Sequence, residues 1–106
     1  MSETKLLIAG KRKTSIAKVR VVDGKGTVLY NKLHLDHMRF FHKLALLEPI
    51  RIYEKIIGKL PYDLTITIVG GGKESQIQAA RLGVARALVA ASKSSELREA
   101  YLKYDR

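Results

Sequence analysis

The sequence predicts one α+β domain that spans residues 1–106, with its elements in the order βββαβα. Runs rich in β-branched residues alternate between apolar and polar positions, as strands do. Two later stretches carry apolar residues at helical spacing. The chain has no internal repeat, low-complexity tract or linker, and 106 residues suffice for one small core.

Three strands are expected near the N-terminus. Residues 6–9 form a short apolar run that ends at Gly10, and residues 15–22 are rich in β-branched side chains. The sequence Asp-Gly-Lys-Gly at 23–26 is typical of a turn, and residues 27–30 return as a third strand. The second and third strands are therefore predicted to form a hairpin.

The first helix is predicted to begin at Asp36, whose side chain can cap it, and to run to about Leu47. Glu48-Pro49 should interrupt this helix, because proline disfavours helical geometry in the preceding residue. A further helical piece would then run from Pro49 to Ile57.

The second half of the chain gives the clearest signals. Residues 64–69 alternate as a strand and end at three consecutive glycines, 70–72. Residues 75–91 follow with helical spacing and six alanines between 79 and 91, which predicts a slim helix that packs close to a sheet. Ser95 is expected to cap a last helix over residues 96–103.

The charge of the chain favours a polyanionic partner. Twenty Lys and Arg residues against ten Asp and Glu residues give a formal charge of +10 and a pI near 10.0. A merely soluble basic protein would interleave both signs, but residues 4–22 contain no acidic residue. The cations of this stretch are Lys5, Lys11, Arg12, Lys13, Lys18 and Arg20. Nucleic acid is the expected partner, ahead of an anionic membrane surface.

Several classes of protein are disfavoured by what the sequence lacks. Without cysteine there is no disulfide, thiol catalysis or thiolate metal site. No apolar run approaches the roughly 20 residues of a membrane span, and the start Met-Ser-Glu-Thr-Lys lacks the pattern of a secretory signal. We therefore expect a soluble, intracellular protein with no membrane partner.

The triple glycine resembles a phosphate-binding loop only loosely, because it lacks the spacing of a nucleotide motif and Ser75 stands where a dinucleotide fingerprint needs its third glycine. One glycine would suffice for a turn, so three predict that another backbone comes very close. His34, His37 and His42 lack further residues for a zinc set, and no spacing supports a catalytic pair with Ser15 or Ser75. We therefore expect that the protein is not an enzyme and that it binds neither a cofactor nor a small-molecule substrate.

Base stacking is not the expected mode of binding. Phe40 and Phe41 fall in the first predicted helix and are assigned to the core, and the five tyrosines are scattered. Arg81 and Arg86 lie roughly 140° apart on a helical wheel. One of them could therefore reach RNA while the other pairs with an acid such as Glu74.

Two motifs resemble the family of small-subunit ribosomal protein nine. Residues 10–19, Gly-Lys-Arg-Lys-Thr-Ser-Ile-Ala-Lys-Val, resemble its N-terminal signature. Residues 70–88 resemble its central signature, from the triple glycine through Ser-Gln to Ala-Arg-Ala-Leu. The motifs stand in the family's order, and the likeness covers essentially the whole chain. Residues 47–49 and 104–106 resemble the archaeal and eukaryotic branch.

The resemblance implies a two-layer α/β sandwich with an unusual left-handed βαβ crossover. It implies a structural constituent of the small ribosomal subunit that binds small-subunit ribosomal RNA in the head, beside neighbouring head proteins and near the peptidyl-tRNA site. With the basic N-terminal run, it gives these candidate RNA-binding residues: Lys11, Arg12, Lys13, Thr14, Lys18, Arg20, Gly70, Gly71, Gly72, Lys73, Ser75, Gln76, Arg81 and Arg86.

Members of the family usually continue into a long basic tail that reaches the peptidyl-site tRNA, and this sequence stops at Arg106. No residue here is therefore expected to contact that tRNA. Two other hypotheses remain open. A free-standing nucleic-acid-binding or RNA-chaperone module shares the charge argument but not the two ordered motifs. A small nucleotide-binding enzyme would rest on the glycine loop alone.

Overall fold

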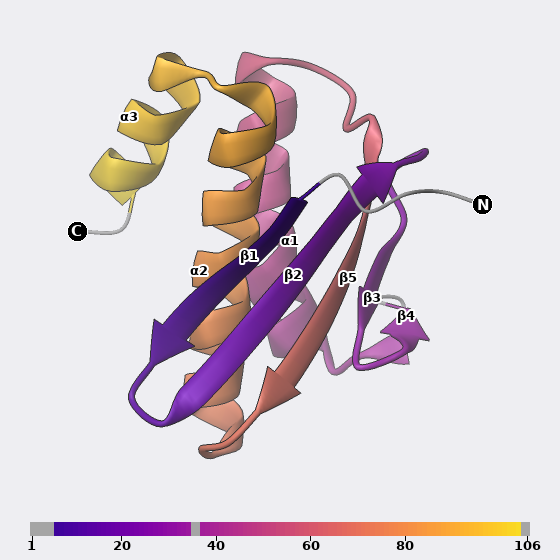
Figure 1. Ribbon diagram of the computed structural model, residues 1–106, viewed down its shortest axis with the longest axis vertical. Helices are drawn as coiled ribbons and strands as arrows, with labels where there is room; N and C mark the ends of the chain where they lie inside the picture. The colour runs from indigo at the N-terminus through magenta and orange to yellow at the C-terminus, as the bar shows by residue number, and fades with distance from the viewer. Residues whose placement is uncertain (1–5, 35–36, 105–106) are drawn as a thin grey trace.

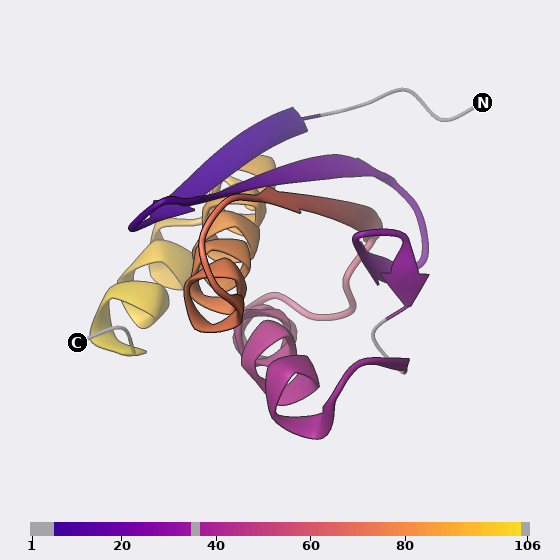
Figure 2. The same cartoon turned by 90° about the horizontal axis from the view of Figure 1, so that it is seen from below.

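The computed structural model describes residues 6–34 and 37–104. Five strands of the described chain form one sheet in the order β1-β2-β5-β3-β4, and the three helices lie on the same side of it (Figures 1 and 2). This arrangement confirms the predicted α+β class. The strands are β1 (Leu6–Arg12), β2 (Ser15–Asp23), β3 (Val28–Tyr30), β4 (Leu33–His34) and β5 (Tyr62–Val69). The helices are α1 (Phe40–Ile56), α2 (Lys73–Ser92) and α3 (Ser95–Tyr104).

The predicted hairpin between residues 15–22 and 27–30 is wrong. Strand β2 pairs with β1 across a two-residue turn and with β5 on its other side, both antiparallel. Strand β3 pairs in parallel with β5, so that β5 separates the two strands assigned to the hairpin. The turn signal at residues 23–26 fixes where the chain reverses, but it does not fix which strand becomes the neighbour. The short strand β4 was not predicted.

The connection from β3 through α1 to β5 is left-handed. Strands β3 and β5 are parallel neighbours, and in Figure 1 both run downwards with β5 to the left of β3. Figure 2, seen from below, has the sheet on one side and the helices on the other, so the helices lie behind the sheet in the view of Figure 1. The resemblance implied this crossover, whereas the general preference of βαβ units is strongly right-handed.

Helix α1 continues through Pro49, so the predicted interruption is wrong. The missing N–H of Pro49 costs one helical hydrogen bond. The helix nevertheless buries Leu46, Ile50 and Tyr53 against the core, and this packing outweighs the local preference. The predicted cap, Asp36, lies outside the described residues; the residue before α1 is Arg39, whose side chain makes no capping hydrogen bond.

Helix α2 packs against strands β1 and β2 at very short range, as its alanines predicted. A Cβ atom on Gly10 of β1 would lie 2.6 Å from the carbonyl oxygen of Ala79 and 2.6 Å from the amide nitrogen of Gly83. Ala79, Ala80 and Ala87 of the same helix are fully buried. The small residues thus bring the helix backbone and the strand backbone together.

Helix α3 is capped by Ser94 rather than by Ser95. The amide of Leu97 donates a 3.1 Å hydrogen bond to the Ser94 hydroxyl oxygen, and Ser95 is already the first residue of the helix. The predicted helix is otherwise confirmed, and Leu97 and Tyr101 anchor it in the core.

Candidate nucleic-acid interface

The two sequence motifs meet at one end of the molecule. The turn between β1 and β2 lies beside the loop between β5 and α2, at the lower end of Figure 1. A Cβ atom on Gly70, whose φ is +80°, would lie 2.4 Å from the carbonyl oxygen of Thr14. A Cβ atom on Gly71, whose φ is +70°, would lie 2.0 Å from the hydroxyl oxygen of Ser15. The predicted close backbone contact is confirmed, and the contacting segment belongs to this chain.

Ser15, Ser75 and Gln76 hold this contact together. Ser15 is fully buried; its hydroxyl donates a 2.9 Å hydrogen bond to the Gly70 carbonyl and lies 2.7 Å from the Ser75 hydroxyl. The side-chain Nε2 of Gln76 donates to the same Gly70 carbonyl at 3.1 Å. The Ser75 hydroxyl has one proton, which it donates either to Ser15 or to the Gly72 carbonyl 3.1 Å away. The hydroxyls of Ser15 and Ser75, which we call the serine lock, therefore hold the β1–β2 turn against the β5–α2 loop. The sequence alone did not reveal this role.

The exposed cations of the first motif surround this lock. Lys11, Arg12, Lys13 and Thr14 are all exposed, and the Arg12 Nε atom donates a 2.9 Å hydrogen bond to the side chain of Gln78 on α2. Gly72 has no atom within 4 Å of an added Cβ, so its surroundings are open. Lys73, which follows it at the start of α2, is exposed as well.

Lys18 and Arg20 lie on the face of the sheet that the helices leave uncovered. On β2 they alternate with Ala17, Val19 and Val21, which are fully buried under the helices. Lys11 shares the uncovered face, since the register pairs it with Ile16, which also faces away from the helices. These cations therefore form a second surface, continuous with the first at Lys11.

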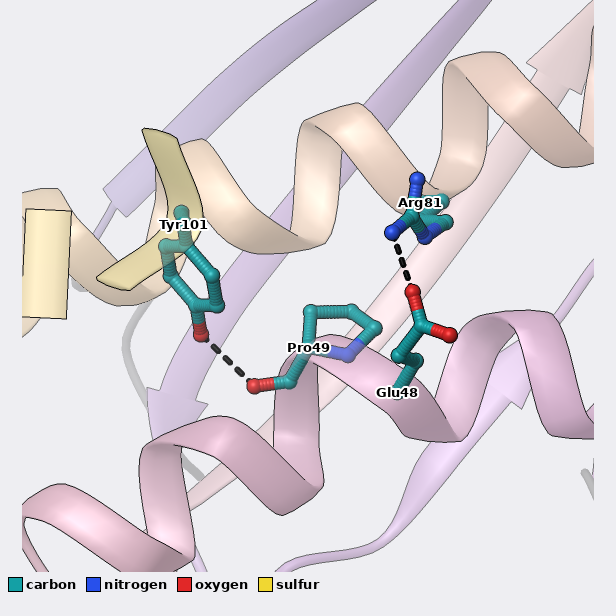
Figure 3. A network of polar contacts seen from close by, with 4 residues as sticks. All are labelled: Glu48, Pro49, Arg81 and Tyr101. Carbon is teal, nitrogen blue, oxygen red and sulfur yellow. Dashed lines mark hydrogen bonds and ion pairs between the residues drawn. The ribbon is translucent and has the colours of Figure 1, made fainter. Parts of the chain in front are cut away.

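Arg81 and Arg86 lie apart from the loops. Arg81 forms an ion pair with Glu48 of α1 (Figure 3), so pairing with an acid is confirmed for this arginine. Arg86 is exposed and its guanidinium lies 3.4 Å from the carbonyl oxygen of Ala9, at the free edge of β1. The structure therefore does not bring these arginines together with the glycine loop.

The assignment of Phe40 and Phe41 to the core is wrong. Their side chains are 66% and 80% exposed at the start of α1. Arg39 and His42, their neighbours in the chain, line a groove together with His37 and with Lys73 of α2, whereas the two phenylalanines do not line it. The sequence signal was the run His-Met-Arg-Phe-Phe-His-Lys at 37–43, in which cations flank two aromatic rings without an acid.

These segments form what we call the basic end: residues 11–14, 37–43 and 70–76. The N-termini of α1 and α2 both lie at this end in Figure 1, and each adds the positive pole of a helix dipole. Glu74 is the one carboxylate in these segments. Against it stand Lys11, Arg12, Lys13, Arg39, Lys43 and Lys73.

One carboxylate holds a turn toward the opposite end, where β5 begins. Asp63, the second residue of β5, accepts hydrogen bonds from the amides of Thr27, Lys25 and Gly26 at 2.9–3.2 Å. These bonds, led by the one from Thr27, lower the pKa of Asp63 below its usual value. Asp63 therefore holds the turn after β2, away from the basic end.

The described residues offer neither a metal site nor a membrane span. Within residues 6–34 and 37–104, no group of three His, Cys, Asp or Glu side chains could hold a metal ion. None of the helices in this part of the chain is long and apolar enough to cross a membrane.

Comparison with known proteins identifies the family. The family model described as ribosomal protein S9/S16 matches residues 10–105. A small ribosomal subunit protein uS9 from Methanococcus vannielii is 36% identical over 98 residues, which cover 92% of this chain and 72% of that protein. The uS9 protein from Desulfurococcus amylolyticus is 37% identical over 101 residues, with coverages of 92% and 69%. Both organisms are archaea, in agreement with the predicted branch. The chain belongs to the ribosomal protein S9/S16 family.

Proposed function

We propose that this chain is a structural, non-enzymatic component of the small subunit of cytoplasmic ribosomes and that it binds small-subunit ribosomal RNA through its basic end. The relatives are named as small ribosomal subunit proteins, which supports the assembly. The observation that carries the RNA contact is the convergence of both family motifs on one cationic, acid-poor end of the fold.

The physical mechanism is neutralisation of phosphates by a preorganised surface. Lys11, Arg12, Lys13 and Lys73 release counterions when they approach RNA phosphates. The serine lock fixes the turn that presents the first three of these cations, so less freedom is lost on binding. Gly72, the open glycine, gives an RNA backbone room to approach the start of α2.

The wider surface includes Thr14, Lys18 and Arg20 on the hairpin, with Arg86 at its edge. Arg81 is the weakest member of the candidate set, because its guanidinium is engaged by Glu48. We place the contact in the head of the subunit near the peptidyl-tRNA site, on the strength of the family resemblance. The proposal assigns no tRNA contact to the described residues.

The test measures affinity for a head-domain fragment of small-subunit ribosomal RNA as a function of salt. Contact with about six phosphates gives a log–log slope on the order of −4 to −5. Neutralising three cations in Lys11→Gln/Arg12→Gln/Lys13→Gln should make the slope shallower by roughly 2 to 3. The matched control, Lys55→Gln/Lys59→Gln/Lys93→Gln, removes the same charge from exposed positions toward the opposite end.

An equal change of slope in both triple variants would show that only total charge matters, which contradicts a localised interface. A slope near zero for the unmodified chain would overturn RNA binding altogether. Co-sedimentation with small subunits in high salt separates the ribosomal role from the alternative, a free-standing nucleic-acid-binding or RNA-chaperone module. Such a module would bind RNA with the same slope but would be washed off the subunits.

A further inference from the structure

Phe40 and Phe41 form an exposed aromatic pair on the basic end. Their ring centroids are 5.5 Å apart and their planes meet at 68°, close to an edge-to-face arrangement. Such a pair covers at most one of the four ring faces, so open faces remain for a ligand. Exposed apolar clusters of this kind, bordered by polar residues, mark binding sites.

The surroundings of the pair indicate an anionic ligand. Arg39 precedes Phe40 and His42 follows Phe41, and both line the groove that also receives Lys73. The first turn of α1 contains no acidic residue. Glu74, beside Lys73, is the one carboxylate that the segments of the basic end contribute. An apolar ring face beside several cations matches a nucleotide, which joins an aromatic base to a phosphate.

The groove is also continuous with the proposed RNA interface. Lys73 and Gln76 line it, and Gln76 is hydrogen-bonded to Gly70 in the loop that faces the β1–β2 turn. A strand of RNA whose phosphates lie along the loop and Lys73 would therefore reach Arg39 and His42, the residues that flank the aromatic pair in the chain. A duplex keeps its bases stacked inside, so only an unpaired base can present its face to a phenylalanine.

We propose that Phe40 and Phe41 stack on an unpaired base of the RNA that the basic end binds, with the neighbouring phosphates held by Arg39 and Lys73. This inference rests on the proposed function and adds to it a mode of recognition that the charge alone does not provide. Phosphate contacts position the chain, whereas stacking selects single-stranded positions such as loops and bulges.

The experiment compares the unmodified chain with Phe40→Leu/Phe41→Leu, which keeps apolar side chains but removes the aromatic faces. Binding to the head-domain fragment should weaken about 5- to 150-fold, the range for the loss of one base–aromatic stack. The salt slope should stay unchanged, because no phosphate contact is lost. Lys73→Gln should instead make the slope shallower by roughly 0.7 to 0.9. Leu102→Ala, which shortens an exposed apolar side chain on α3, should change neither the RNA affinity nor the salt slope.

The outcomes separate the two proposals. If the leucine variant binds as tightly as the unmodified chain while Lys73→Gln weakens binding, stacking is overturned and the RNA-binding function stands. If the leucine variant binds RNA normally but fails to join small subunits, the pair docks a protein and stacking is again overturned. If the unmodified chain shows no salt-dependent binding, the proposed function itself fails. Circular dichroism checks that the variant is folded; otherwise Phe41→Leu, at the more exposed position, replaces it.

Discussion

Gly70 and Gly72 stand two positions apart in the same loop but have opposite surroundings, and this contrast gives a test at the scale of single residues. Gly70→Ala forces a Cβ atom to within 2.4 Å of the Thr14 carbonyl at a φ of +80°. We expect it to lower the free energy of unfolding by about 2–4 kcal/mol, because strain and backbone overlap add. Gly72→Ala, in extended geometry with open space around it, should cost no more than about 1 kcal/mol.

Urea denaturation measures both variants, and comparison of their midpoints at equal slope isolates the effect on stability. RNA affinity then distinguishes the two roles of the triple glycine. The Gly72→Ala variant should lose affinity while remaining folded, if RNA approaches this position. Equal stability of the two variants would mean that the contact between the loop and the β1–β2 turn is not as close as described.

Single residues also show which contacts could be predicted from the sequence and which could not. Three adjacent glycines predicted a close backbone contact, because only glycine tolerates one at a positive φ. The contacting partner could not be predicted, since Thr14 lies 56 positions away along the chain and only the β2–β5 pairing brings it near. Phe40 was misassigned for a related reason: its spacing to Leu44 matches a buried stripe, but the stripe reaches the core only from the second turn of α1.

At the scale of elements, α3 is fastened to the rest of the fold by few interactions, and Tyr101 makes one that can be removed cleanly. Its hydroxyl donates a 2.6 Å hydrogen bond to the Pro49 carbonyl in the buried contact between α3 and α1 (Figure 3). Tyr101→Phe should lower the free energy of unfolding by about 1 kcal/mol. Leu97→Ala should cost about 2–5 kcal/mol, because Leu97 is fully buried.

Hydrogen exchange locates the effect, because a loosened α3 should exchange faster while β2 and β5 stay protected. Leu102→Ala, exposed on the same helix, serves as the neutral control and should change stability by less than about 0.5 kcal/mol. Uniform loss of protection in Tyr101→Phe would contradict the view that α3 opens separately.

Elements with a strong period were predictable, and those decided by tertiary packing were not. Strand β5 and helix α2 alternate or repeat so regularly that their type follows from the sequence. Helix α1 continues through Pro49 because burial on both sides outweighs the local effect of proline, and local rules do not include this term. The two-residue strand β4 has too few residues for any period to be recognised.

At the scale of the whole molecule, the order of the strands was beyond the sequence pattern. The insertion of β5 between β2 and β3 and the left-handed crossover depend on how the whole sheet packs, and general rules favour the opposite hand. The left-handed crossover was predicted only from the resemblance to the family. Net charge, in contrast, was read directly from composition, and the fold then brings six Lys or Arg residues from three segments together at the basic end.

This crowding of cations predicts how the free chain responds to salt. Six Lys or Arg residues share the basic end with one carboxylate, so the folded state carries repulsion that RNA phosphates would relieve. Raising NaCl from 0.05 to 0.5 M shortens the Debye length from roughly 14 to 4 Å and should raise Tm. Each 1 kcal/mol of relieved repulsion corresponds to about 4–8 °C for a domain of this size. Thermal unfolding followed by circular dichroism measures the shift, and NaCl is preferred to sulfate, which strengthens apolar burial by itself.

The Lys11→Gln/Arg12→Gln/Lys13→Gln variant should show a smaller shift than Lys55→Gln/Lys59→Gln/Lys93→Gln, because it removes charge where the cations are crowded. Equal shifts in the two variants would show that the repulsion is spread over the whole surface instead of being stored at the basic end.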